Sequence, residues 1–115
     1  MTPEQDFLVA ADATLAAIGA ALDAALADSE TDLDWTLRDG ILTIECEDGG
    51  KIIVNRHVPN REIWVAARSG GFHFRRDGDA WMDTRSGGAL QPFLTRLLAE
   101  QAQLVVELPQ LQAGK

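Results

Sequence analysis

The first part of the chain repeats apolar side chains at the spacing of an α-helix. Over residues 4–28 an apolar side chain recurs every three or four positions, which gathers these side chains into one stripe. Thr2 offers a side-chain cap, Pro3 suits a first turn, and the acids that follow favour the positive end of the helix dipole. We therefore predict a helix over residues 4–28, with a buried stripe of Phe7, Ala11, Leu15, Ile18, Leu22 and Leu26.

From Thr31 the apolar positions alternate with polar ones, which is the pattern of strands with one buried face. The alternation continues to residue 37 and resumes over residues 42–47, after Asp39-Gly40, a strong hairpin signal. Glu45 and Glu47 should share the outward face of the second strand, as Asp32 and Asp34 should on the first. Further strands are predicted over residues 51–56, 62–68, 72–75 and 80–83. Every connection is too short for a parallel crossover, so we expect five or six antiparallel strands in a meander.

A second helix is predicted over residues 90–103, with Pro92 in its first turn, where the missing N–H costs little. The tail, residues 104–115, carries Val105, Val106, Leu108 and Leu111 and is too apolar to lie entirely in water, so we expect it to pack along the helices. The order of elements favours one α+β domain over residues 1–115. Its expected architecture is a two-layer sandwich with both helices on one sheet face and the other face open.

Composition excludes several classes of protein. A net charge of −8 disfavours nucleic-acid binding, which needs an excess of Lys and Arg. No uninterrupted apolar run approaches the roughly 18–20 residues of a membrane span, so no membrane association is expected. The single cysteine, Cys46, has no partner for a disulfide or thiolate metal site and is expected in the core, in a reducing compartment. The acidic start MTPEQDF lacks the features of a targeting peptide, and we expect a cytoplasmic protein.

The usual catalytic motifs are also missing. The sequence contains no GxSxG elbow, P-loop or GxGxxG, and its two histidines lack a zinc-binding spacing. The glycine pairs at 70–71 and 87–88 are interpreted as turns.

The negative charge is concentrated in the first half of the chain. Residues 1–50 hold twelve acids and one base, whereas residues 51–115 hold six acids and nine bases. Like charges at 5–7 Å repel by roughly 0.6–0.8 kcal/mol per pair in water, so such a strip is expected to attract cations or a basic partner. Carboxylates alone suit hard ions such as iron, manganese, calcium and magnesium. A solvated face that only keeps the protein soluble is the alternative.

Asp12 and Asp23 lie on one flank of the predicted first helix but about 16 Å apart along its axis, so they cannot share one ion. On the open sheet face, Asn55, Trp64 and His73 are expected side by side. An exposed tryptophan there would anchor a partner, unless its neighbours shield it. His57 is expected in a loop, and Trp35 and Trp81 in the core or at its edge.

Several stretches match the pattern of a known family over nearly the whole chain. They are DSETDLDW at 28–35, the run at 39–74, Trp81 and DTRSGG at 83–88. The most specific pieces surround Ile53, Asn55 and Arg56, then Ile63-Trp64, Gly70-Gly71-Phe72-His73-Phe74 and Asp83 to Gly87. On these residues the chain resembles bacterial frataxin, the CyaY family.

The resemblance implies the two-layer sandwich and a non-enzymatic role in iron–sulfur cluster assembly. It further implies weak binding of ferrous or ferric iron, and docking to a cysteine desulfurase, both through an acidic ridge. The protein would act as an iron-responsive regulator of that enzyme or as an iron donor, while the iron–sulfur scaffold protein contacts the sheet through Asn55 and Trp64. Carried over to this sequence, the acidic ridge is Asp23, Asp28, Glu30, Asp32 and Asp34.

Further partner contacts are expected at Asp12, Glu45, Glu47 and His73. The protein is expected to be a monomer. Relatives often carry an acid pair where this chain has Gly19-Ala20 and a histidine where it has Leu8. Because these ligands are missing from the first helix, iron binding is expected mainly at residues 28–34. Two alternatives stay open. One is weak ferroxidase or iron-storage activity, against which the absence of Glu-x-x-His pairs argues. The other is a metal-independent acidic adaptor that binds through Trp64 and the sheet.

Overall fold

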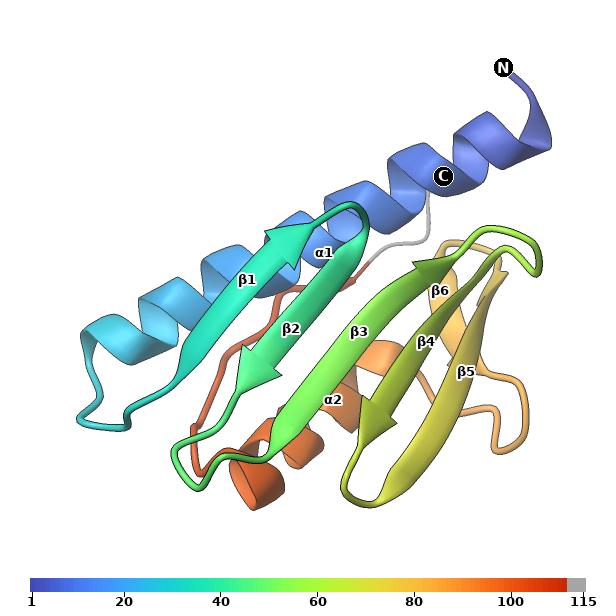
Figure 1. Ribbon diagram of the computed structural model, residues 1–115. Coiled ribbons are helices and arrows are strands. Elements are labelled where there is room, and N and C mark those ends of the chain that lie inside the picture. Colours follow the sequence, from blue (N-terminus) through green and yellow to red (C-terminus); the bar gives the residue numbers. More distant parts are fainter. Residues whose placement is uncertain (112–115) are drawn as a thin grey trace.

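The computed structural model describes residues 1–111 and arranges them as helix, six-stranded sheet and helix (Figure 1). The strand order β1-β2-β3-β4-β5-β6 follows the sequence, and every neighbouring pair is antiparallel. Both helices lie on the same side of the sheet (Figure 1), so the predicted two-layer sandwich is confirmed. The elements are α1 (Pro3–Ala27), β1 (Asp34–Arg38), β2 (Ile41–Glu45), β3 (Lys51–His57), β4 (Glu62–Ala67), β5 (Gly70–Asp77), β6 (Ala80–Asp83) and α2 (Leu90–Gln101).

The helix α1 begins with a reciprocal cap. The Gln5 N–H donates to the Thr2 hydroxyl, and the Thr2 N–H donates to the Gln5 side chain, which satisfies two N–H groups that a helix start leaves free. Its predicted stripe is buried against the sheet, except that Leu26 is only half-buried. By length and composition α1 also qualifies as a membrane span, which the sequence interpretation did not anticipate because it looked for an unbroken apolar run of that length. In this structure one face of α1 forms part of the protein core.

Several strand boundaries differ from the prediction. β5 begins at Gly70 and ends at Asp77, so the pair Gly70-Gly71, which we had interpreted as a turn, lies in this strand, and the turn is formed by residues 68–69.

Two further differences concern acidic residues. β1 begins at Asp34, because β2, its one partner strand within residues 1–111, ends opposite it at Glu45. Asp32 therefore precedes the strand. β2 ends because Cys46 closes the next turn, donating its N–H to the Gly50 carbonyl and accepting from the Gly49 N–H. Glu47 thus lies in the turn. The prediction that it shares the outward face of β2 was wrong.

The core lies between the sheet and the helix layer. Trp81 is 1% exposed, as predicted, and its indole N–H donates to the Thr14 hydroxyl of α1 at 2.9 Å. Cys46 is also buried, and this burial, together with the nearby Asp48 carboxylate, raises the pKa of its thiol. The thiol is therefore protonated at neutral pH and a poor nucleophile.

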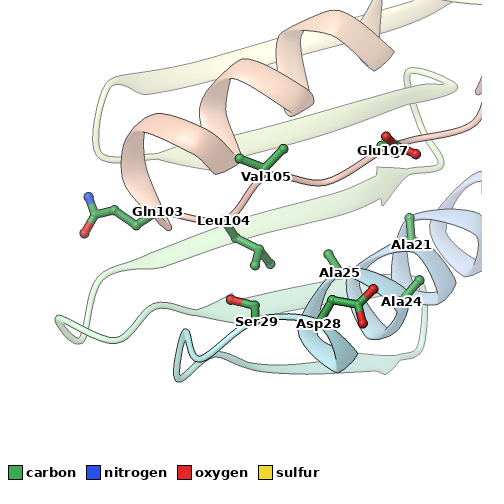
Figure 2. A pocket seen from close by; sticks show the side chains of 9 residues that line it. All are labelled: Ala21, Ala24, Ala25, Asp28, Ser29, Gln103, Leu104, Val105 and Glu107. Atoms are coloured by element: carbon green, nitrogen blue, oxygen red, sulfur yellow. The ribbon is translucent and has the colours of Figure 1, made fainter.

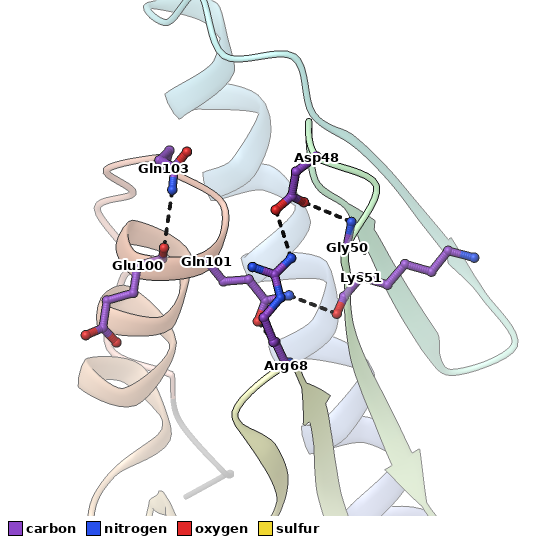
Figure 3. A network of polar contacts seen from close by, with 7 residues as sticks. All are labelled: Asp48, Gly50, Lys51, Arg68, Glu100, Gln101 and Gln103. Atoms are coloured by element: carbon purple, nitrogen blue, oxygen red, sulfur yellow. Dashed lines mark hydrogen bonds and ion pairs between the residues drawn. The ribbon is translucent and has the colours of Figure 1, made fainter.

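A polar network ties the end of α2 to the sheet (Figure 3). The buried Gln101 amide donates to the Lys51 carbonyl of β3 and accepts the Arg68 N–H beyond β4. The Arg68 guanidinium in turn donates to Asp48 in the turn between β2 and β3 at 2.8 Å. This network holds in place the turn that carries Glu47.

The tail after α2 packs along the helix layer, as predicted. The helix ends two residues earlier than expected, since Gln103 has a φ of 54°. From there the tail is extended, and its buried side chains are Leu104, Val106, Leu108 and Leu111. Val105 is the exception to the prediction, because its side chain is exposed. The same prediction for residues 112–115 lies outside the described residues.

Candidate functional site

The acidic ridge follows the end of α1 into β1. Asp28 caps α1 at its C-terminus, Glu30 and Asp32 lie in the connection, and Asp34 begins β1. All four side chains are exposed. Among the described residues none of them forms a salt bridge, although five such pairs occur elsewhere in the molecule. Their mutual repulsion is therefore not relieved within this part of the chain.

The sheet brings a further acid to the ridge. Asp34 on β1 stands opposite Glu45 on β2, and Glu45 in turn stands opposite Lys51 on β3. Side chains at such paired positions lie about 4.5–5.5 Å apart at their Cβ atoms. Two carboxylates thus share the edge of the open sheet face. The expectation that Glu45 adds to the acidic surface agrees with this register.

Asp23 has a different environment from the rest of the ridge. Its carboxylate accepts the Trp35 indole N–H at 2.8 Å. The indole lies over Gly19, one helical turn before Asp23, where a Cβ would come within 2.7 Å of the ring. The glycine therefore allows Trp35 to lie flat on α1, and Asp23 anchors the ring as well as contributing charge.

Asp12 is paired within the protein. It accepts a hydrogen bond from the Arg56 guanidinium of β3, which crosses over Gly40 to reach it. Gly40 has a φ of 76°, and a Cβ there would lie 2.2 Å from the Arg56 side chain. Because Asp12 is neutralised and lies far along α1, the structure does not join it to the ridge.

The ridge offers oxygen donors without a preformed cage. Within residues 1–111 no three His, Cys, Asp or Glu side chains are placed to hold one ion together. The pair Asp34 and Glu45 supplies carboxylate oxygens only, with the other coordination positions open to water or to a partner. Such a donor set fits hard cations held weakly.

On the open sheet face the register brings the three predicted residues together. Asn55 on β3 pairs with Trp64 on β4, which pairs with His73 on β5. Trp64 is half-buried rather than exposed, because its neighbours cover both ring faces. His73 stacks on one face at 4.3 Å between ring centroids, and His57 stacks on the other at 3.6 Å. His57 is the last residue of β3, so its assignment to a loop was wrong.

A buried carboxylate holds this stack. Glu62 is 3% exposed, although it points to the open face. It accepts the Trp64 indole N–H at 2.8 Å and an Arg75 N–H at 2.7 Å, and the His73 ring lies 3.7 Å away. Sequence reasoning missed this cluster. The available signal was that His57 and Glu62 share the outward parity of Asn55 and Trp64 on the same hairpin.

Comparison with known proteins identifies the family. The family model of the frataxin-like domain matches residues 1–104. The chain belongs to the frataxin-like family. An iron–sulfur cluster assembly protein CyaY from Cupriavidus pinatubonensis is 44% identical over 105 residues, which cover 91% of this chain and 95% of the relative.

Solved frataxins share the fold of this frataxin-like chain. Frataxin from Psychromonas ingrahamii superimposes with a TM-score of 0.82 at 26% identity, covering 92% of this chain and 97% of that one. A trimeric frataxin from Saccharomyces cerevisiae, complexed with ferrous iron, has a TM-score of 0.71 at 27% identity and covers 82% and 86%. The fold is therefore that of the frataxins.

Proposed function

We propose that this protein acts in iron–sulfur cluster assembly as an iron-binding regulator of the cysteine desulfurase or as an iron donor to the pathway. Its family membership and its similarity to CyaY assembly proteins support the pathway. The observation that carries the role is the run of exposed acids from Asp28 to Asp34, none of which is neutralised within the described residues.

In this proposal iron is cargo that the acidic ridge holds weakly. The carboxylates of Asp34 and Glu45 supply two facing donors, and the nearby acids attract the cation to this edge. Iron bound to a yeast frataxin of the same fold supports the choice of ion. Hard oxygen donors with open positions suit an ion that must be passed on rather than stored.

The same ridge docks a basic surface of the cysteine desulfurase. Charge complementarity of this kind accelerates encounter and makes affinity depend on salt. The scaffold protein contacts the sheet face at Asn55 and Trp64. Because both faces of the Trp64 ring are covered, this contact uses the edge of the indole and the flanking imidazoles. A cytoplasmic monomer is the form we propose.

Titration with Co²⁺ or Fe²⁺, followed by two-dimensional amide NMR, tests the iron site. We expect localised shifts or broadening at residues 28–34 and at Glu45. The double variant Asp34→Asn, Glu45→Gln should lose them. The matched control is Asp77→Asn, Asp79→Gln, which removes two exposed acids from the hairpin between β5 and β6. Equal responses in the two variants, or none in the wild type, would contradict iron binding on the ridge.

A further inference from the structure

The two edges of the sheet differ in how they are protected. At one edge, Met82 of β6 forms a β-bridge with Ala89, so the segment before α2 lies along this strand. The other edge is β1, the outermost strand at that side of the sheet (Figure 1), whose one partner strand within residues 1–111 is β2. Thr36, Leu37 and Arg38 of β1 are all exposed. An exposed edge strand is a template on which another strand can pair.

The geometry of the hairpin shows which backbone groups of β1 face this open edge. Asp39 and Gly40 form a two-residue turn in which both φ angles are positive, 52° and 76°. The residues that flank such a turn exchange both backbone hydrogen bonds, and hydrogen-bonded positions then alternate along the strand. The N–H and C=O groups of Trp35 and Leu37 therefore point away from β2, toward the open edge.

A hollow of about 650 Å³ lies at this edge. Its lining comes from the hairpin of β1 and β2 and includes no residue of α1, so the helix leaves the edge accessible. Leu37 and Ile41, which line the hollow, are two of the five large apolar side chains that are exposed in the described residues. A strand placed along β1 would cover apolar surface as well as satisfy backbone groups.

The charges of β1 match those of a second copy of the same strand. Asp34 and Arg38 lie two residues on either side of Thr36 and share the open face of the sheet. About 13 Å of extended chain separates them, so they cannot pair with each other. Neither forms a salt bridge with another described residue. If two copies pair antiparallel with Thr36 opposite Thr36, Asp34 of each copy stands opposite Arg38 of the other.

The same register uses the open backbone groups. Trp35 of one copy then stands opposite Leu37 of the other, and these are the residues whose N–H and C=O groups face the edge. On the helix side of the sheet the two apolar side chains form a cross-strand pair. Centring the pair on Trp35 or on Leu37 would instead place Thr36 opposite a charged residue and leave the charges within β1 unmatched.

A hollow in the helix layer offers a second copy no such match. It measures about 600 Å³ and lies between the end of α1 and the tail that follows α2 (Figure 2). Its two charged lining residues, Asp28 and Glu107, are both acidic. Two copies that met at this hollow would therefore repel each other.

We propose that two copies of this chain associate through β1, antiparallel and centred on Thr36, so that their sheets join into one continuous sheet. Each β1 contributes five residues, and so small an interface gives a weak complex, with a Kd on the order of 0.1–1 mM. Arg38, the one base within residues 1–50, pairs in this complex with Asp34 of the other copy.

The pairing has a consequence for the acidic ridge. Because it occupies Asp34, the monomer remains the form that docks to partners, and the paired form is a resting state in which part of the ridge is covered. This consequence rests on the proposed function. The pairing itself rests on β1 alone and is tested without metal and without a partner protein.

The first measurement is the concentration dependence of the wild-type protein in metal-free buffer. Between about 20 µM and 1 mM the sedimentation coefficient should rise, and the amide resonances of Trp35 and Leu37 should shift. The amide of Thr36 faces β2 and should shift less. A wild type that stays monomeric at about 1 mM, or that shifts only at residues outside the hairpin of β1 and β2, would overturn the proposal.

Charge reversal tests the register. Asp34→Arg and Arg38→Asp each place like charges opposite each other at two positions, so each should weaken self-association at least about fivefold. Asp79→Arg and Arg85→Asp are matched controls, because they make the same changes in net charge at exposed positions outside β1. They should change the affinity less than about twofold. Equal weakening by the controls would mean that net charge, rather than the pairing of β1, governs association.

An equimolar mixture of the Asp34→Arg and Arg38→Asp proteins gives the sharpest result. In the mixed pair opposite charges again face each other at both positions, so affinity should return to within about threefold of wild type. The double variant Asp34→Arg, Arg38→Asp should also recover it. If both fail to recover affinity while remaining folded by circular dichroism, the register is wrong. That failure would leave iron binding and desulfurase docking untouched, since neither takes part in this experiment.

Discussion

Replacement of Gly19 by alanine should destabilise the protein, although alanine is the better helix former. A Cβ at this position would lie 2.7 Å from Cη2 and 2.9 Å from Cζ3 of Trp35, too close for either atom to stay in place. The indole is a rigid ring held at its other end by the hydrogen bond to Asp23. Moving the ring off the helix therefore disturbs its packing and this hydrogen bond together.

The size of the effect follows from three contributions. Exchanging glycine for alanine inside a helix gains about 0.5–1 kcal/mol. Forcing an extra methyl group into a packed contact costs about 1–3 kcal/mol. Weakening the hydrogen bond from Trp35 to Asp23 costs about 0.5–1.5 kcal/mol more. We expect Gly19→Ala to lower the free energy of unfolding by about 1–2 kcal/mol, measured by urea denaturation with circular dichroism.

A second background separates packing from helix propensity. In a Trp35→Ala protein the obstacle is gone, so the same Gly19→Ala change should stabilise by about 0.5–1 kcal/mol. The sign of the effect thus reverses between the two backgrounds. Stabilisation of similar size in both would refute the argument that Gly19 is required by the close approach of Trp35.

Three further predictions concern the sheet, the turn after β2 and the thiol. Glu62→Ala should cost about 1–3 kcal/mol of unfolding free energy and shift the indole N–H resonance, because it removes a buried acceptor; Glu62→Gln should cost less, and equal losses would contradict this. The hydrogen bond from Arg68 holds the pKa of the Asp48 carboxyl below its usual value. This stabilises the fold above the unfolded pKa and is lost as pH falls through the folded one. The stability difference between wild type and Asp48→Asn should therefore shrink between pH 7 and pH 3, and a constant difference in urea denaturation would argue against it. Native Cys46 should react with iodoacetamide at least about tenfold more slowly than in urea, and equal rates would contradict its burial.

Elements whose apolar side chains recur at a regular spacing were predictable from the sequence. The stripe of α1 and the Asp39-Gly40 turn specify local structure through side chains close in the chain. Boundaries were less predictable, because a strand extends only as far as its partner. The alternation around Asp32 continues in the sequence, but β2 has no residue left to pair with it. Glu47 fails for a related reason, since backbone hydrogen bonds of the turn end the strand before it.

The candidate site shows the same division. The concentration of exposed acids and the row of Asn55, Trp64 and His73 followed from counting and parity. The burial of Glu62 did not, because it depends on how the rings of a hairpin and its neighbour lean over one carboxylate. Gly19 also carried a signal that only the structure explains. A glycine inside a long helix marks a close approach, yet its partner Trp35 lies on another element.

Calorimetric titration of the cysteine desulfurase with this protein tests the central claim most directly. The quadruple variant Asp28→Lys, Glu30→Lys, Asp32→Lys, Asp34→Lys reverses the uncompensated acids of the ridge. The control variant Asp77→Lys, Asp79→Lys reverses two exposed acids elsewhere on the sheet. We predict that the quadruple variant keeps its circular dichroism spectrum and loses at least about 100-fold in affinity, while the control changes less than about threefold and wild-type binding weakens with added salt. Unchanged affinity of a folded quadruple variant would contradict the account.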